Sequence, residues 1–254
     1  MKKIYFRFYA HLNKFFSSPK DGQLQVHHFK GRQSIKDRIE TMGVPHTEVS
    51  LILCNGQPVN FSQIVEDGDR FSIYPRPFLL PLPEKIRLRP PYPGKPRFVL
   101  DTHLGKLARY LRRYNFDTVY RNDFDDREIV DLAQKEKRII LTRDHGLLMR
   151  KRVVYGFFIH DDDPQQQLAS VFAHFDLFQY DTEEKGRCTS CNTELKEVPK
   201  EEIIERLEPK TKKFFQEFRL CPDCDQIYWK GSHYKKTEKL LADLPEKILE
   251  NRSR

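Results

Sequence analysis

The sequence lacks long hydrophobic runs. No stretch of 18 apolar residues occurs among its 254 residues, so no membrane-spanning helix is expected. Hydrophobic residues make up only 38% and the mean hydropathy is −0.70, which indicates small cores beneath a heavily charged surface. The N-terminus is basic but has no small-residue cleavage site, and charged residues interrupt its apolar stretch. We therefore expect a strand there rather than a signal peptide, and a cytoplasmic protein with no membrane partner.

Acidic residues are outnumbered, 37 against 45 lysines and arginines, but they are not evenly spread. Residues 1–96 carry 15 basic and 8 acidic side chains, residues 97–184 carry 14 and 16, and residues 185–254 carry 16 and 13. A basic chain indicates solubility in the first place, and a polyanionic partner is the second interpretation. Acidic residues concentrated in its centre suggest metal ions that handle phosphate.

Residues 1–78 have a β-rich pattern. The stretch KIYFRFYA alternates as a strand does, and SIKDRIETMG predicts a helix that Ser34 caps and Gly43 stops. Asn55-Gly56 between two apolar runs predicts a hairpin. This order resembles the ubiquitin-like β-grasp fold, most closely its small sulfur-carrier branch. Carriers end in a free Gly-Gly, whereas here the last strand runs into YPRPFLLPLPEK. We therefore expect a docking or scaffold role toward a protein partner rather than carrier chemistry.

Three further segments follow. Residues 79–96 predict a stiff, proline-dense linker with a basic edge. Residues 97–182 alternate strand and helix, with RFVL, DTVY, RIILT and VVYGFFI as the strands, which predicts an α/β fold with a parallel, doubly wound sheet. Residues 183–254 hold two Cys-x-x-Cys pairs and a basic helical tail.

An aspartate stands at or just beyond the end of three of these strands. Asp101 comes after FVL, Asp144 after RIILT, and Asp161 after VVYGFFI. Ligands of open parallel sheets bind outside the carboxyl ends of the strands. Asp125 and Asp126 open the helix between the second and third strands, where a carboxylate also suits the helix dipole. Converging carboxylates favour Mg²⁺ or Mn²⁺, and a metal-bound water could then attack a phosphodiester.

The same aspartates have a structural alternative. Asp125 and Asp126 could serve only as helix caps, and Asp161–Asp163 before Pro164 could be a solvated loop with a cap. Asp101 and Asp144 could likewise cap the turns that follow their strands. The sequence leaves both interpretations open.

The first helix after the linker presents a basic face. Leu104, Leu107, Ala108 and Leu111 form its core stripe, at helical spacing. The basic residues of that helix are then expected on its outer side, directly after Asp101, where they could hold a phosphate backbone: Lys106, Arg109, Arg112 and Arg113. Arg143, next to Asp144, could face the substrate or pair with a neighbouring acid.

The cysteines are few but patterned. Cys188-x-x-Cys191 and Cys221-x-x-Cys224 are separated by 29 residues and predict one structural Zn²⁺ held by four thiolates. Disulfides would need a secretory context. The stretch IYWKGSH after the second pair, with Lys235 and Lys236, could stack bases and hold phosphates, or could cover a thin ribbon core.

Several of these motifs together resemble the Mut-seven C-terminal RNase family. They are FVLDTHLGKLARYLRRYNFDT, NDFDDREIVDLAQKEKRIILTRD, RCTSCN and CPDCDQIYWKGSHYKK. The resemblance implies a PIN-like nuclease domain with a zinc ribbon, preceded by a ubiquitin-like domain, and metal-dependent RNA cleavage. When the family's acidic positions are carried over to this sequence, the resemblance implies Asp101 as the acid after the first strand, Asp126 as the acid that opens the helix and Asp144 as the acid of the TRD motif. Asp125 or Asp161 would be the fourth.

The sequence thus predicts a Mg²⁺- or Mn²⁺-dependent ribonuclease. Lys106, Arg109, Arg113 and Arg143 would position phosphate, and Zn²⁺ would fold the ribbon. The alternative is a non-catalytic RNA-binding adaptor that uses the ribbon and the basic surfaces. An aspartate-based phosphatase is disfavoured, because LDTH lacks the second aspartate that such enzymes use as acid and base.

Overall fold

The computed structural model describes residues 1–18, 22–75, 83–180, 186–231, 239 and 242–243. These form two compact units, one made of residues 1–94 and 122–160, the other of residues 95–121 and 161–254. Within the described ranges, no helix is long and apolar enough to cross a membrane. His233, Lys235, Lys236, the basic tail beyond residue 243 and the predicted boundaries near 78 and 182 lie outside the described residues.

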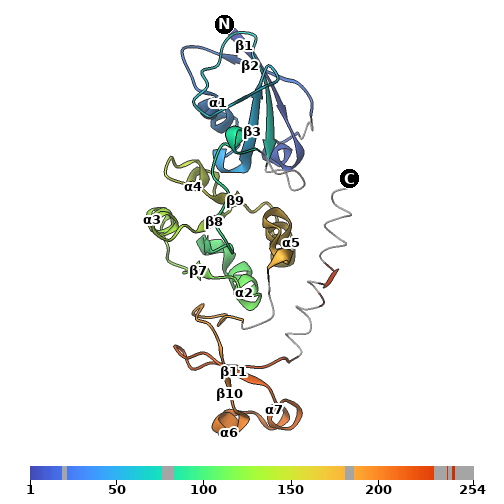
Figure 1. The fold of residues 1–254 in the computed structure, drawn as a ribbon, viewed down its shortest axis with the longest axis vertical. Coiled ribbons are helices and arrows are strands. Elements are labelled where there is room, and N and C mark those ends of the chain that lie inside the picture. The colour runs from blue at the N-terminus through green and yellow to red at the C-terminus, as the bar shows by residue number, and fades with distance from the viewer. Residues whose placement is uncertain (19–21, 76–82, 181–185, 232–238, 240–241, 244–254) are drawn as a thin grey trace. The chain divides into compact units, whose positions relative to one another are not determined.

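The N-terminal segment is a mixed five-stranded sheet with one helix (Figure 1). The strand order is β2-β1-β5-β3-β4, with β1 and β5 parallel and the other pairs antiparallel. Buried aromatic and aliphatic side chains, among them Phe6, Phe8 and Ile73, fill the core against the helix. This topology confirms the predicted β-grasp fold. The elements are β1 (Lys2–Phe8), β2 (Gln25–Phe29), α1 (Ile35–Thr41), β3 (Val49–Cys54), β4 (Gln57–Val59) and β5 (Arg70–Pro75).

Local sequence explains its turns. Ser34 caps α1 through a reciprocal capping box with Asp37, which satisfies two backbone N–H groups at the helix start. Asn55 and Gly56 join β3 to β4 with φ of 50° and 84°, the left-handed conformation that a two-residue hairpin turn requires. Both features were predicted from the sequence.

The central segment alternates strand and helix, as predicted. Its four strands belong to one sheet, in which β6 pairs in parallel with β7, and β8 with β9. Parallel pairs confirm the α/β class. The elements are β6 (Phe98–Leu100), α2 (Gly105–Arg113), β7 (Thr118–Tyr120), α3 (Asp126–Glu136), β8 (Ile139–Thr142), α4 (His145–Met149), β9 (Gly156–Phe158) and α5 (Pro164–Phe175).

The cysteine-bearing segment contains a small antiparallel sheet, in the order β10-β11-β12. The 29-residue spacer between the cysteine pairs contains two short α-helices and two strands. Its core is thin, with Ile203, Leu207 and Phe218 as the buried residues. The elements are β10 (Lys196–Val198), α6 (Lys200–Ile203), α7 (Pro209–Phe214), β11 (Phe218–Leu220) and β12 (Ile227–Tyr228).

The β-grasp segment is joined to strand β9 through a buried turn at residues 46–48. The Glu48 side chain is 1% exposed, and its Oε1 accepts a 2.6 Å hydrogen bond from the backbone N–H of Phe158. Its Oε2 lies 3.2 Å from Nε2 of His11. His46 lies 2.9 Å from the carbonyl of Val153 through Nε2. The β-grasp segment is therefore built into the same unit as β8 and β9.

The linker adds to this junction. Arg89 donates from its guanidinium to the carbonyl oxygens of Thr47 and Val49, both at 2.5 Å, and also to that of His46. A fourth carbonyl, that of Val154, accepts from Arg89 at 3.3 Å. One cation of the predicted basic edge is thus used to hold the buried turn.

Replacing Glu48 with alanine leaves the partly buried N–H of Phe158 without its acceptor. We expect the free energy of unfolding to fall by about 1–3 kcal/mol, measured by urea denaturation. Glu66→Ala, an exposed glutamate of the same segment, is the matched control and should change it by less than about 0.5 kcal/mol. Equal losses in the two variants would contradict the role given to Glu48.

Candidate functional site

Two of the predicted acids cap the turns that follow their strands. Asp101, after β6, accepts from the backbone N–H of Thr102 at 2.5 Å and from its hydroxyl at 3.2 Å. Asp144, after β8, is exposed and accepts from the N–H of Gly146 at 2.7 Å through Oδ1. The Asp144 N–H donates to the hydroxyl of Thr142 at 2.9 Å. Each carboxylate thus has a structural role at a strand end, where the sequence placed it.

The acids that open α3 differ from each other. Asp125 is the N-cap, in a reciprocal capping box with Glu128 at 2.8 and 3.0 Å. Asp126 is the first helical residue, and its Oδ2 accepts from Nη2 of Arg150 at 2.6 Å. The two side chains of that ion pair are 42% and 45% exposed, so the pair adds little stability by itself. Sequence reasoning missed Arg150, because nothing in its local pattern links it to a helix 24 residues away.

A ready-made metal site is formed by the cysteines and not by the acids. In the part of the chain that the structure describes, the ligand atoms of Cys188, Cys191, Cys221 and Cys224 lie within 4.8 Å of one another. Asp125, Asp126 and Asp144, which share one compact unit, do not form such a group among the described residues. Asp161 is half-buried, and its backbone carbonyl accepts from the Gln167 side chain at 3.0 Å.

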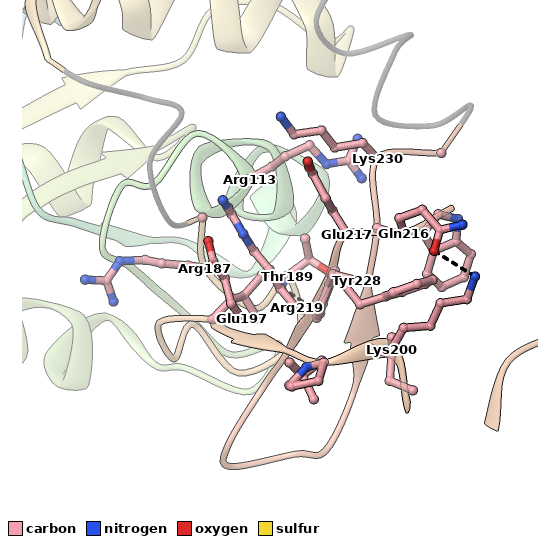
Figure 2. A pocket seen from close by; sticks show the side chains of 18 of the residues that line it. Arg113, Arg187, Thr189, Glu197, Lys200, Gln216, Glu217, Arg219, Tyr228 and Lys230 are labelled. Atoms are coloured by element: carbon pink, nitrogen blue, oxygen red, sulfur yellow. Dashed lines mark hydrogen bonds between the residues drawn. The ribbon is translucent and has the colours of Figure 1, made fainter. Parts of the chain in front are cut away.

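The basic face of α2 is only partly as predicted. Lys106 and Arg109 are exposed, as is Arg143 after β8. Arg113 is half-buried and lines a pocket beside the ribbon (Figure 2).

The predicted outward position of Arg112 is wrong. Arg112 is 4% exposed. Its guanidinium donates to the carbonyls of Thr118, Thr189 and Ser190, each at 2.9 Å. Burial lowers the pKa of Arg112. The nearby Cys188 and Cys191, as thiolates, act in the opposite direction and raise that pKa. The guanidinium therefore joins α2 to the first cysteine turn, and is not available to a substrate.

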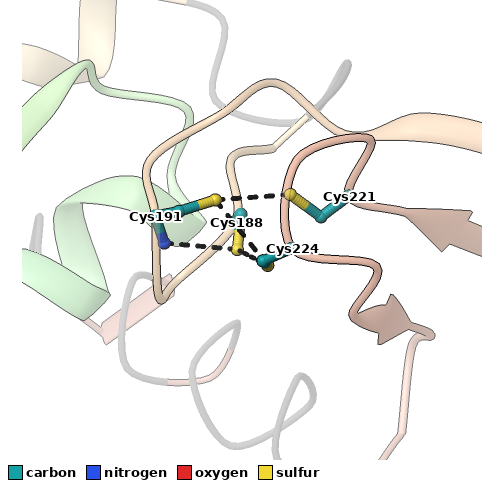
Figure 3. A group of neighbouring side chains, drawn as sticks. All are labelled: Cys188, Cys191, Cys221 and Cys224. Atoms are coloured by element: carbon teal, nitrogen blue, oxygen red, sulfur yellow. Dashed lines mark hydrogen bonds between the residues drawn. The ribbon is translucent and has the colours of Figure 1, made fainter.

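The four cysteine side chains point toward one another (Figure 3). Their Sγ atoms are separated by 3.4 Å for Cys188 and Cys224, 3.3 Å for Cys191 and Cys221, and 3.7 Å for Cys191 and Cys224. Zinc–sulfur bonds of about 2.3 Å put tetrahedral ligands roughly 3.8 Å apart, which is close to these separations. All four cysteines are free thiols. The set can bind zinc and leaves no open coordination position.

Both cysteine turns have the same backbone geometry. The N–H of the residue after the second cysteine bonds to the carbonyl of the first, from Asn192 to Cys188 at 2.9 Å and from Asp225 to Cys221 at 3.0 Å. Asn192 and Asp225 have φ of 73° and 59°, a left-handed conformation that Asn and Asp tolerate better than most residues. The motifs CTSCN and CPDCD therefore encode two equivalent cysteine turns, each of which presents two thiols to the cluster.

Comparison with known families agrees with this architecture. The family described as Mut7-C RNAse domain matches residues 96–241, and the one described as Mut7-C ubiquitin matches residues 1–78. The first match spans more than half of the chain. The chain belongs to the Mut7-C RNase family. No curated protein and no solved structure matches it significantly.

In this Mut7-C chain, Tyr228 belongs to the cysteine site. Its hydroxyl lies 3.1 Å from Sγ of Cys188 and accepts from the N–H of Thr189 at 3.1 Å. Burial raises the pKa of the Cys188 thiol, but hydrogen bonds from Tyr228 and from the Cys191 and Ser190 N–H groups outweigh it and lower that pKa to about 6. The phenol thus stabilises a thiolate, the form in which cysteine binds metal.

Replacing Arg112 with methionine should destabilise the ribbon end of the molecule. The side chain keeps its apolar volume but leaves three carbonyls without their donor, so we expect a loss of about 1–3 kcal/mol in the free energy of unfolding. Trp229, the single tryptophan, lies in the ribbon and reports its unfolding by fluorescence. Arg109→Met, exposed on the same helix, is the control, and an equally stable Arg112→Met would show that the three bonds contribute nothing.

Proposed function

We propose that the protein hydrolyses RNA phosphodiester bonds, using Asp101, Asp126 and Asp144 as ligands of Mg²⁺ or Mn²⁺. The observation that carries this proposal is membership of an RNase-domain family, combined with Asp101 directly after β6 and Asp144 just beyond β8. A bound divalent ion would supply an activated water and polarise the phosphate. Asp125 or Asp161 would be the fourth acid.

Asp144 can hold a cation without giving up its capping bond, and the partner of Asp126 is exposed. Asp144 uses Oδ1 for its cap, which leaves Oδ2 for a ligand role. Asp126 is held by Arg150, an exposed partner that could turn to a phosphate oxygen when the carboxylate binds metal. Lys106, Arg109, Arg113 and Arg143 would bind the phosphates of the RNA strand.

The four cysteines support a structural Zn²⁺. We propose cytoplasmic RNA as the substrate and a protein partner for the β-grasp segment, with no role for a membrane. A non-catalytic RNA-binding adaptor is the second candidate. It is favoured by the capping roles of Asp101, Asp125 and Asp144, each of which has a structural reason to be acidic.

The decisive experiment compares wild type with Asp144→Asn on a mixed RNA pool in Mn²⁺. Asparagine caps helices as well as aspartate, so thermal stability should hold or rise. Cleavage should fall at least about 10- to 100-fold, the usual cost of losing even an outer-shell partner of a metal site. Asp163→Asn, which alters the cap of α5, is the matched control and should cleave normally.

The two candidate functions separate cleanly in that experiment. RNA binding without cleavage by the wild type would establish the adaptor. Cleavage that survives Asp144→Asn, or an unfolded Asp144→Asn variant, would mean that Asp144 is a structural cap and that the nuclease site lies elsewhere.

Elemental analysis should find one zinc per chain. Cys221→Ser should lose that zinc and unfold the ribbon, because the thin core around Phe218 cannot hold three strands by itself. Cys54→Ser, a buried thiol of the β-grasp core, should keep the zinc. A folded ribbon that contains no metal would contradict the assignment.

A further inference from the structure

A cavity of about 820 Å³ lies beside the ribbon sheet (Figure 2). Its walls come from the end of α2, the first cysteine turn, and strands β10, β11 and β12. Binding sites for small molecules and cofactors have volumes of about 300–1,000 Å³, so the space is large enough for a nucleotide. None of the residues proposed to ligate Mg²⁺ or Mn²⁺ lines it.

The walls carry more positive than negative charge, with five cationic and three anionic side chains. The five cations are Arg113, Arg187, Lys200, Arg219 and Lys230. Arg187 pairs with Glu194, and Lys200 donates to the side chain of Gln216 at 3.0 Å.

Gly186 lies where two arginine-bearing elements meet. Nη1 of Arg219 and the carbonyl of Arg113 are 3.8 and 3.9 Å from the place where a Cβ of residue 186 would be. The φ of Gly186 is +60°, which favours glycine. The chain therefore enters the ribbon by a turn that brings β11 next to the end of α2, and both arginines to one wall.

Trp229 supplies an aromatic surface to the same cavity. It is 41% exposed, although its ring centroid is 6.4 Å from that of Phe215 and 6.5 Å from that of Phe218. The indole folds back over Gly231, whose Cβ, if present, would lie 2.9 Å from Nε1. The ring is thus held against two phenylalanines while part of it remains accessible.

We propose that this cavity binds one unstacked nucleotide of single-stranded RNA, with its base on Trp229 and its phosphates near Arg113 and Arg219. The inference rests on RNA being the substrate of the proposed function. Proteins bind single strands by combining cationic grooves with aromatic platforms that any base can stack on. A duplex has no free base face to offer, so the cavity should discriminate by strandedness and not by sequence.

The single tryptophan makes the proposal directly testable. The probe is a ten-nucleotide oligouridylate, added to zinc-loaded full-length Asp144→Asn protein so that cleavage does not interfere. We expect saturable quenching of the tryptophan fluorescence, and no comparable quenching by a ten-base-pair RNA duplex. Anisotropy of a labelled strand gives the affinity independently.

Variants separate stacking from general charge. Trp229→Ala should weaken binding of the strand about 5- to 150-fold, the range expected for one base–aromatic stack, while Trp229→Phe should retain most of the affinity. Phe214→Ala removes a more exposed ribbon aromatic that does not line the cavity, and should bind as the parent does. Arg113→Gln with Arg219→Gln should weaken binding and flatten its salt dependence.

Several outcomes would overturn the proposal: no quenching, equal quenching by duplex, or unchanged binding by a folded, zinc-loaded Trp229→Ala. These are distinguishable from failure of the proposed function. Quenching by single strands without any cleavage by the wild type would support the cavity and reject the nuclease. Cleavage without quenching would do the reverse.

Discussion

A buried charge must keep its hydrogen-bond partners, and two such charges hold this protein's segments in place. Glu48, 1% exposed on its side chain, takes the N–H of Phe158 in β9 as a partner. Arg112, 4% exposed, binds two carbonyls of the first cysteine turn. These partners are distant in sequence, so only this arrangement of the segments supplies them. In any other arrangement each buried charge would lack its hydrogen bonds and would destabilise the fold. The β-grasp segment is for this reason built into the unit that contains β8 and β9.

The acids near the strand ends all have structural partners. Asp101 and Asp144 each accept backbone N–H groups at the start of a helical turn, and Asp126 has Arg150. A helix start also favours negative charge, because its unpaired N–H groups point outward. Capping and metal binding are therefore compatible uses of one side chain, and the cap by itself does not argue against the ligand role.

Much of the fold could be predicted from local patterns, because short-range physics determines those parts. The Asn55-Gly56 turn, the Ser34 cap and the strand–helix alternation depend on neighbouring residues, and the cysteine cluster follows from spacing. The failures all involve distant partners. Helical periodicity placed Arg112 outside, but its acceptors Thr189 and Ser190 lie 77 and 78 residues away. Arg150 and Glu48 were missed for the same reason. The acids' positions behind strands were predictable, but their capping bonds were left as one of two alternatives.

Helix α2 connects Asp101 to the first cysteine turn and to the ribbon cavity. It starts at Gly105, four residues after Asp101, and ends at Arg113, so it is roughly 13 Å long. At its far end Arg112 points inward to the cysteine turn, while Arg113 lines the ribbon cavity. Metal binding at the cysteines would fix the carbonyls that Arg112 holds, and hence the orientation of its neighbour. A structural zinc could in this way set the distance between a nucleotide in the cavity and the carboxylate of Asp101, although it would take no part in the chemistry.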